Sequence, residues 1–331
     1  MTIIDEQPAQ KGEPDISTPI GETEMGEGVL SNGVPGEATL TICVPAYKDS
    51  ADALLASLIR LDDADQCTLL IFDDGSQNAD LTRILTQQIL RFPGPARLIT
   101  SQDNMGRAHA RNRLIALAET DWILFLDADM HPDSPDFLSR YLAAATDSDT
   151  PSLIPGGFSL KHAHPTDETR LHAAQSLASE CVDASVRARQ PGRYVFTSNI
   201  LVHREILETV QFDDAFKGWG WEDVDWGLRI AEQYPITHID NPATHLGLDS
   251  DDTLMAKYSG SSANFARVLQ RHPDALKQTP LYKASRFLSR MPGRSLLKAI
   301  AGMMAKRRFL PIKVRLYALK LYRASAYAGA V

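Results

Sequence analysis

The chain has 331 residues, 44% of them hydrophobic, and a formal net charge of −8 at pH 7. This composition is typical of a soluble globular protein with one or two domains, and it argues against a nucleic-acid-binding protein. The three cysteines, Cys43, Cys67 and Cys181, are far apart, which predicts reduced thiols in a cytoplasmic protein rather than a disulfide framework or a zinc site.

Residues 1–36 predict a disordered acidic tail. They are rich in Glu, Asp, Gly and Pro and nearly lack aromatic and clustered aliphatic residues. Such a segment cannot bury enough apolar surface to offset the entropy that ordering costs. The stretch does not resemble a signal peptide, and no apolar run approaches the ~18 residues that a membrane-spanning helix needs.

From residue 39, strands are expected to alternate with helices. The β-rich runs cover residues 39–44, 68–72, 97–100 and 123–126. Helical patterns between them lie near residues 50–59, 80–90 and 110–115. This alternation predicts βαβ units and therefore an α/β fold with a mostly parallel central sheet flanked by helices.

Polar side chains follow three of these predicted strands. Pro45 and Tyr47 follow the first, Asp74 the second, and Asp127 and Asp129 the fourth. The carboxyl ends of parallel strands line the crevice where α/β sheets bind ligands. Two neighbouring carboxylates suit a hard divalent cation, which is usually held together with substrate phosphates. A solvated acidic loop is the alternative for the aspartate pair alone, but three such strand ends together predict a nucleotide site.

The second half predicts strands at 152–155, 194–202 and 236–240 and helices at 168–189 and 224–233. Before the last helix stands Gly-Trp-Gly-Trp-Glu-Asp, residues 218–223. Its glycines let a ligand approach the backbone, and its tryptophans offer flat apolar faces to a sugar. The alternative is that Glu222 and Asp223 only complement the helix terminus while the tryptophans fill a core. His245, after the last strand, suits Mn²⁺ beside carboxylates.

Residues 251–331 predict a helical, basic extension. No acidic residue follows Asp274, whereas Lys and Arg recur from Lys277 to Arg323, with apolar residues at helical spacing between them. Basic amphipathic helices suit an anionic membrane surface, which we expect residues 277–331 to contact. The alternative is a helical subdomain that packs on the core or in a homodimer.

The order and spacing of five motifs resemble the family 2 glycosyltransferases, which are inverting enzymes of the GT-A fold. The motifs are Val-Pro-Ala-Tyr at 44–47, Asp-Asp-Gly-Ser at 73–76, Asn-Met-Gly with Ala-Arg-Asn at 104–112, Leu-Asp-Ala-Asp at 126–129 and the tryptophan motif at 218–223. The resemblance implies a Rossmann-like GT-A domain over residues 37–250. The last motif is also similar to that of β-1,4-galactosyltransferases, which have Gly where this chain has Trp221.

The resemblance also implies roles for individual residues. Asp223 would be the general base. A divalent metal, Mn²⁺ or Mg²⁺, would be held by Asp129, His245 and Asp127. The nucleotide sugar would be contacted by Pro45, Tyr47, Asp49, Asp74, Arg111 and Asp127. The acceptor and the transferred sugar would be contacted by Trp219, Trp221 and Glu222.

The sequence therefore predicts a metal-dependent inverting glycosyltransferase. It would move a sugar from a UDP-sugar donor to a hydroxyl of a glycan or lipid-linked acceptor, on the cytoplasmic face of the cell membrane. The alternative is a catalytically inactive sugar-nucleotide-binding or scaffolding protein of a polysaccharide assembly. The presence of Asp127, Asp129, Glu222 and Asp223 together favours the enzyme.

Overall fold

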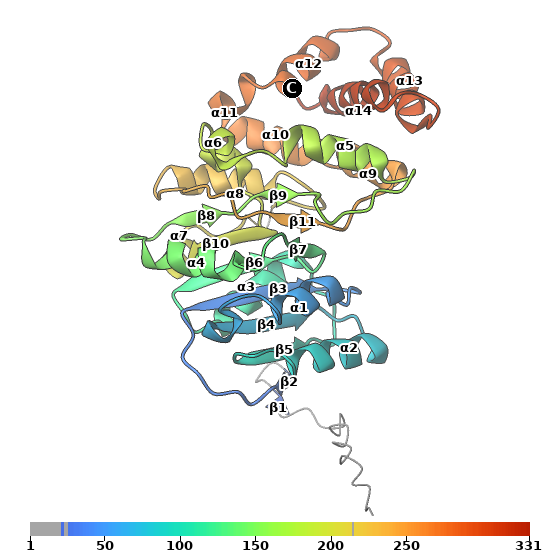
Figure 1. The fold of residues 1–331 in the computed structure, drawn as a ribbon. Helices are drawn as coiled ribbons and strands as arrows, with labels where there is room; N and C mark the ends of the chain where they lie inside the picture. Colours follow the sequence, from blue (N-terminus) through green and yellow to red (C-terminus); the bar gives the residue numbers. More distant parts are fainter. Residues whose placement is uncertain (1–20, 23–25, 214) are drawn as a thin grey trace, which may run out of the picture.

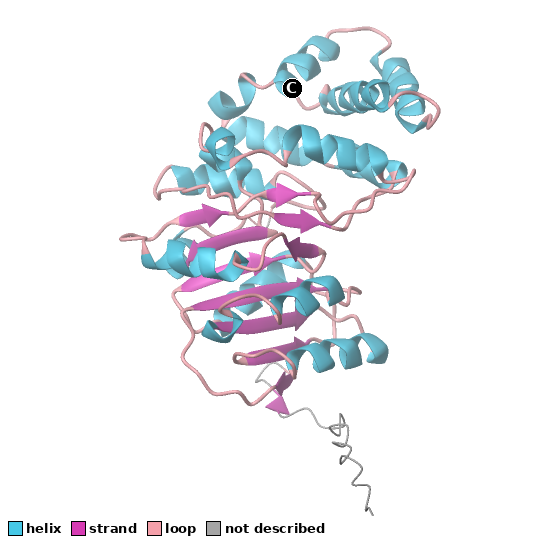
Figure 2. Cartoon of the chain, in the orientation of Figure 1, coloured by secondary structure: helices cyan, strands magenta, loops and turns pink. Residues whose placement is uncertain are grey.

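The computed structural model describes residues 21–22, 26–213 and 215–331. An eight-stranded sheet lies at its centre, with helices on both faces (Figures 1 and 2). The strand order is β1-β2-β5-β4-β3-β6-β10-β8. The four middle strands are parallel, and they are β3 (Leu40–Ala46), β4 (Cys67–Asp73), β5 (Ala96–Thr100) and β6 (Trp122–Leu126). The predicted mostly parallel α/β sheet is confirmed.

The middle strands are continuously apolar because helices cover both faces of the sheet. Successive side chains of a strand point to opposite faces, so Val44 and Cys43 belong to different core clusters. One face is covered by α1 (Asp52–Leu58), α2 (Ala79–Ile89) and α4 (Phe137–Thr146). The other face is covered by α3 (Arg107–Leu117), α7 (Arg204–Thr209) and α8 (Glu222–Ala231).

The chain order creates a topological switch point between β3 and β6. Strands β3, β4 and β5 follow one another across the sheet, and the chain then returns to place β6 on the other side of β3. In open α/β sheets, ligands bind outside the carboxyl ends of the strands at such a point. Here those ends are Ala46 and Leu126, which directly precede Tyr47 and Asp127.

Beyond β6 the sheet is antiparallel. Strand β10 (Asn199–His203) pairs with β6 and with β8 (Leu153–Pro155). The predicted strand at 194–202 is therefore wrong in its first half, because residues 191–194 form a 3₁₀ turn and 195–198 a loop. The predicted strand at 236–240 runs beside β8 but forms only an isolated bridge there.

The predicted helix at 168–189 is divided into α5 (Arg170–Ser179) and α6 (Ala184–Arg187). The break lets the Arg187 side chain turn inward, where it is 1% exposed. Its guanidinium donates to the carbonyl oxygens of Pro155, Gly156 and Ile239. A straight helix would leave these buried carbonyls without this donor.

A small second sheet lies beside the carboxyl end of β6. Its strands are β7 (Met130–Pro132), β11 (Ala243–His245) and β9 (Phe158–Ser159). In the antiparallel pairing of β11 with β7, His245 lies opposite Met130. His245 thus belongs to a strand, rather than following one, and stands next to Asp129.

Part of the predicted disordered tail is ordered. Strand β2 (Gly28–Ser31) pairs with β5, and β1 (Gly21–Glu22) pairs with β2. Glu27 is buried and accepts two hydrogen bonds from Arg113. This segment gains its order from a sheet edge and an ion pair, neither of which composition reveals. Residues 1–20 and 23–25, the rest of the predicted tail up to β2, lie outside the described residues.

The C-terminal region is helical, as expected, and it packs on the rest of the molecule through α5 and α8 (Figure 1). Its helices are α9 (Asp251–Gly260), α10 (Ser262–Arg271), α11 (Pro273–Lys277), α12 (Pro280–Ser289), α13 (Arg294–Lys306) and α14 (Ile312–Tyr327). In the part of the chain that the structure describes, no helix has the length and apolar character to cross a membrane.

Candidate active site

Asp127 is fixed at the end of β6 by two partners. Arg111, from α3, donates to its Oδ1 at 3.0 Å, and the Ser198 hydroxyl donates to its Oδ2 at 2.8 Å. Ser198 reaches it because the next residue, Asn199, pairs with Leu126. Burial alone would raise the pKa of Asp127, but the Arg111 charge and these hydrogen bonds hold it below its usual value. Asp127 is therefore ionised, with both carboxylate oxygens already engaged.

Asp129 and His245 form the pair that fits a metal ion. The Asp129 Oδ2 and the His245 Nε2 are 3.2 Å apart, and both side chains are partly exposed. A Cβ on Gly247 would collide with the Asp129 carboxylate, so only glycine leaves this carboxylate its place. A carboxylate and an imidazole are ligands that first-row divalent ions accept. The residues fit the predicted metal, although no cluster of three or more ligating side chains exists among the described residues.

Glu222 and Asp223 are the first two residues of α8, and they lie close to Arg111, the partner of Asp127. Asp223 accepts hydrogen bonds from the Thr197 hydroxyl at 3.1 Å and from the Thr197 backbone N–H at 3.4 Å. Burial and the charge of Asp127 raise the pKa of Asp223, against the opposing effect of Arg111. A raised pKa makes a carboxylate a better proton acceptor near neutral pH.

Glu222 is the more perturbed of the two acids. Its Oε2 is buried and has no hydrogen-bond partner. Burial, together with the charge of Asp223, raises its pKa from 4.5 to about 7. Glu222 can therefore gain or lose a proton near neutral pH.

Arg111 is a positive charge close to Asp127, Asp223 and Glu222. It is 5% exposed, and its charge acts on Asp127, Asp223 and Glu222. Its Nε is buried without a partner. One guanidinium thus offsets part of the repulsion among three carboxylates, which allows them to share the site.

The predicted nucleotide contacts lie along the ends of β3 and β4. Tyr47 is 45% exposed, so its ring is accessible to a base. The Lys48 ammonium lies 5.0 Å from the centroid of this ring. Pro45 lies inside β3 and is partly exposed. The Asp49 carboxylate accepts from the Ala51 N–H just before α1, so in this structure it shapes a turn.

Asp74 is buried and holds the loop that precedes α3. Its oxygens accept hydrogen bonds from the backbone N–H groups of Met105 and Gly106 and from the Asn104 amide, at 2.7 to 3.0 Å. The sequence motifs at 73–76 and 104–106 are therefore one structural unit. That Asp74 also accepts from a base stays a prediction.

The two tryptophans of the 218–223 motif differ in their surroundings. Trp219 is 37% exposed, and its ring is tilted against Tyr258, so it remains available to a sugar. Trp221 was expected to contact sugar, but its ring packs on Phe265 and Tyr327, and its Nε1 donates to the Tyr327 hydroxyl. Trp221 therefore joins the loop at 218–223 to the C-terminal helices, and its contact with a sugar stays a prediction.

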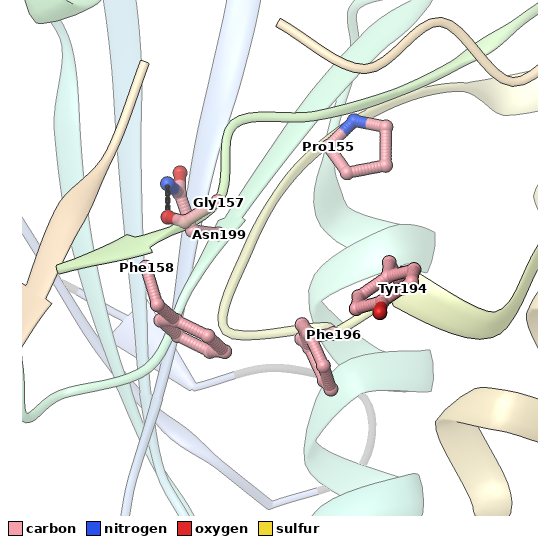
Figure 3. Close-up of a pocket in the computed structure, with 6 residues that line it drawn as sticks. All are labelled: Pro155, Gly157, Phe158, Tyr194, Phe196 and Asn199. Atoms are coloured by element: carbon pink, nitrogen blue, oxygen red, sulfur yellow. Dashed lines mark hydrogen bonds between the residues drawn. The ribbon is translucent and has the colours of Figure 1, made fainter. Parts of the chain in front are cut away.

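Two polar residues of the site, Thr197 and Ser198, were not predicted. They follow Phe196, which lines a small hollow together with Phe158, Asn199 and three other residues (Figure 3). The Asn199 amide donates to the Gly157 carbonyl, which anchors the end of the loop that contains Thr197 and Ser198. The available signal was the run Thr-Ser-Asn at 197–199, which interrupts an otherwise apolar strand pattern.

Glu222→Gln is expected to be more stable than the unmodified protein at pH 8 but not at pH 4.5. The folded-state pKa of Glu222 is about 7 against 4.5 unperturbed, so ionisation destabilises the folded state progressively between those values. The neutral amide escapes this loss, on the order of 3 kcal/mol. Urea unfolding at both pH values measures it, with the exposed Glu208→Gln as control. An equal free-energy difference at both pH values would contradict the raised pKa.

Comparison with known proteins supports the family that the sequence motifs resemble. The model of glycosyl transferase family 2 matches residues 41–209. Over 191 residues the chain is 28% identical to hyaluronan synthase from Pasteurella multocida, covering 49% of this chain and 19% of that protein. Over 269 residues it is 24% identical to validoxylamine A glucosyltransferase from Streptomyces hygroscopicus subsp. jinggangensis (strain 5008), covering 72% and 62%. The chain thus spans less than two thirds of either relative's length.

Among solved structures, the fold is similar to that of the mannosyltransferase PcManGT from Pyrobaculum calidifontis in complex with GDP-Man and Mn²⁺. The TM-score is 0.53 and the sequence identity is 15%, with 89% of this chain and 88% of that chain covered. The likeness extends over nearly the whole of both chains and supports the predicted GT-A architecture.

Proposed function

Because this chain belongs to glycosyl transferase family 2, we propose that it is a glycosyltransferase that moves a sugar from a UDP-sugar to an acceptor hydroxyl with inversion at the anomeric carbon. The observation that carries the proposal is the meeting of three carboxylates, Asp127, Glu222 and Asp223, around Arg111 at the switch point of the sheet. Asp129 follows two residues after Asp127 and pairs with His245. An inactive binding protein would have no need of a carboxylate with a raised proton affinity at this place.

Asp129 and His245 would hold the divalent cation, Mn²⁺ or Mg²⁺. Asp127 is omitted from the proposed ligand set because Arg111 and Ser198 already engage both of its oxygens. A cation bound there would supply Lewis-acid neutralisation of the departing diphosphate. The chain's own contribution is to position Asp129, through the backbone bond from Leu246 and the space at Gly247.

Asp223 would act as the general base. The acceptor hydroxyl is a weak nucleophile at neutral pH, and Asp223 would take its proton as the bond to the anomeric carbon forms. A positioned base of this kind typically contributes ~10²–10⁴-fold to the rate. Thr197 holds the carboxylate in one orientation, and a direct displacement needs no covalent sugar–enzyme intermediate.

A screen of UDP-sugars for metal-dependent hydrolysis and transfer tests the proposal. We expect at least one UDP-sugar to be hydrolysed slowly with Mn²⁺ and not in the presence of EDTA. If UDP binds but no sugar is cleaved or transferred, the inactive binding protein becomes the better interpretation.

The outer face of α12–α14 supports a second proposal, contact with an anionic membrane that carries a lipid-linked acceptor. Large apolar side chains are exposed there: Phe287 by 67%, Leu296 by 66%, Met303 by 54%, Phe309 by 81% and Tyr317 by 74%. No acidic residue lies in these helices. Not every basic residue is available, because Arg315 forms a buried ion pair with Asp251, and Arg308 forms an exposed ion pair with Glu168.

Replacing Phe287, Leu296 and Phe309 together by Ser is expected to weaken binding to anionic vesicles at least tenfold. Each apolar side chain contributes ~1 kcal/mol or more when buried, in addition to ~1 kcal/mol for each nearby Lys or Arg. Sedimentation with phosphatidylglycerol vesicles at low salt measures the effect, and high salt should release the unmodified protein.

Point variants are preferable to deletion of residues 277–331, because deletion would uncover Trp221 and Phe265. Leu177→Ser, at a site 59% exposed on α5, is the matched control. Equal vesicle binding by the triple variant and the control would refute the membrane proposal.

A further inference from the structure

Arg323, on α14, stands among three aromatic rings next to the catalytic loop. Its guanidinium carbon lies 4.4 Å from the ring centroid of Tyr258, 5.4 Å from that of Tyr327 and 5.5 Å from that of Trp221. Its Nε is buried without a hydrogen-bond partner. The residue as a whole is partly exposed, and it forms no ion pair with a carboxylate of the described residues.

Three buried arginines, Arg111, Arg187 and Arg315, have acceptors that suit their charge. Arg315 pairs with Asp251 at 2.6 Å and donates to a backbone carbonyl, whereas Arg187 donates to several carbonyls. Arg111 pairs with Asp127. Arg323 has no carboxylate partner among the described residues, and its side-chain hydrogen bond is to Tyr327. Glu180 affects it electrostatically, but the Glu180 carboxylate accepts its hydrogen bond from Ser176.

The charge of Arg323 is stabilised by its neighbours, but no carboxylate of the described residues pairs with its guanidinium. Burial opposes the charged form, whereas Tyr258, Tyr327 and a side-chain hydrogen bond to Tyr327 outweigh it and raise the pKa of Arg323. An arginine remains charged at all physiological pH values, so this partly exposed guanidinium can still take an anion.

The position of Arg323 relates it to the acceptor side of the site. Trp221, one of its three aromatic neighbours, lies two residues before Asp223. Tyr258, another, packs against Trp219, whose ring has the Lys257 ammonium 5.6 Å from its centroid. The Asn264 amide donates to the carbonyls of residues 217 and 220 and so fixes the loop beside these rings.

We propose that Arg323 binds an anionic group, a carboxylate or a phosphate, of the sugar acceptor, and that the enzyme therefore selects acidic acceptors. The inference rests on the proposed transferase function, in which Asp223 and Trp219 contact the acceptor. The planar guanidinium matches both anions by paired hydrogen bonds. Lys257 adds less, because its ammonium is already paired with Asp249 at 2.6 Å.

Calorimetric titration of the full-length protein with three probes of one ring structure tests this. The probes are p-nitrophenyl β-glucoside, its 6-phosphate and p-nitrophenyl β-glucuronide, each added in the presence of UDP and Mn²⁺. We expect at least one charged probe to bind about tenfold or more tightly than the neutral glucoside. Which of the two charged probes is preferred distinguishes phosphate from carboxylate.

Arg323→Met should abolish that preference while leaving the affinity for UDP unchanged. Arg267→Met, which removes another arginine stacked on an aromatic ring, Phe216, is the matched control and should keep the preference. If Arg323→Met does not fold, Arg323→Lys is the second variant. It keeps the positive charge but lacks the planar guanidinium, so it should partially lower the preference for the charged probe.

Equal binding of the three probes, or binding of none, would overturn the inference. So would a preference that Arg323→Met or Arg323→Lys leaves unchanged. Failure of UDP itself to bind in the same titrations would count against the proposed transferase function instead, since that result concerns the donor site.

Discussion

Asp223→Asn is expected to reduce sugar transfer by ~10²-fold or more while leaving donor binding intact. The amide keeps the size of the side chain and can still accept from the Thr197 hydroxyl, so the loop should hold its shape. It cannot take a proton from the acceptor hydroxyl. The effect should therefore fall on the turnover number and not on the affinity for UDP.

Transfer is measured with the donor identified in the UDP-sugar screen, and UDP affinity is measured separately by calorimetry. Asp121→Asn, at an exposed position before β6, is the control and should behave as the unmodified protein. A variant that retains most of its turnover number would show that a different group accepts the proton.

Asp129→Ala is expected to weaken UDP binding in Mn²⁺ by at least ~10²-fold, since it removes the charged half of a two-residue ligand set. Its partner His245 would remain as a single neutral ligand. UDP binding in EDTA should change little, because Asp129 would act through the cation.

The two conditions together make the experiment specific for the metal. A fold defect would weaken UDP binding in both Mn²⁺ and EDTA, whereas loss of a ligand affects only the former. Equal affinity of Asp129→Ala and the unmodified protein in Mn²⁺ would remove Asp129 from the site.

The donor half of the site could be predicted from the sequence because it depends on strand ends. Each apolar run that stops at a polar motif places that motif at one edge of a parallel sheet. The structure accordingly brings Tyr47, Asp74 and Asp127 to the ends of neighbouring strands. The order of the strands, and hence the switch point, was not predicted, because βαβ alternation indicates parallel strands but not which of them are neighbours.

The remaining features depend on contacts between distant segments, which a local pattern does not encode. Ser198 and Thr197 are loop residues whose partners lie 71 and 26 positions away. Trp221 looks the same in sequence whether it faces a sugar or Tyr327, 106 positions later. The order of β2 comes from pairing with β5, not from its own composition.

The hydrogen bond between Trp221 and Tyr327 means that the loop at 218–223 and the C-terminal helices are not separable modules. A chimera that exchanged residues 251–331 between relatives would set a foreign helix against the native indole. The resulting void or clash would disturb the apolar cluster that Trp221 forms with Phe265 and Tyr327 and would destabilise the fold. Exchange of the C-terminal region among such enzymes should therefore carry residues 218–223 with it, so that both sides of the contact come from one parent.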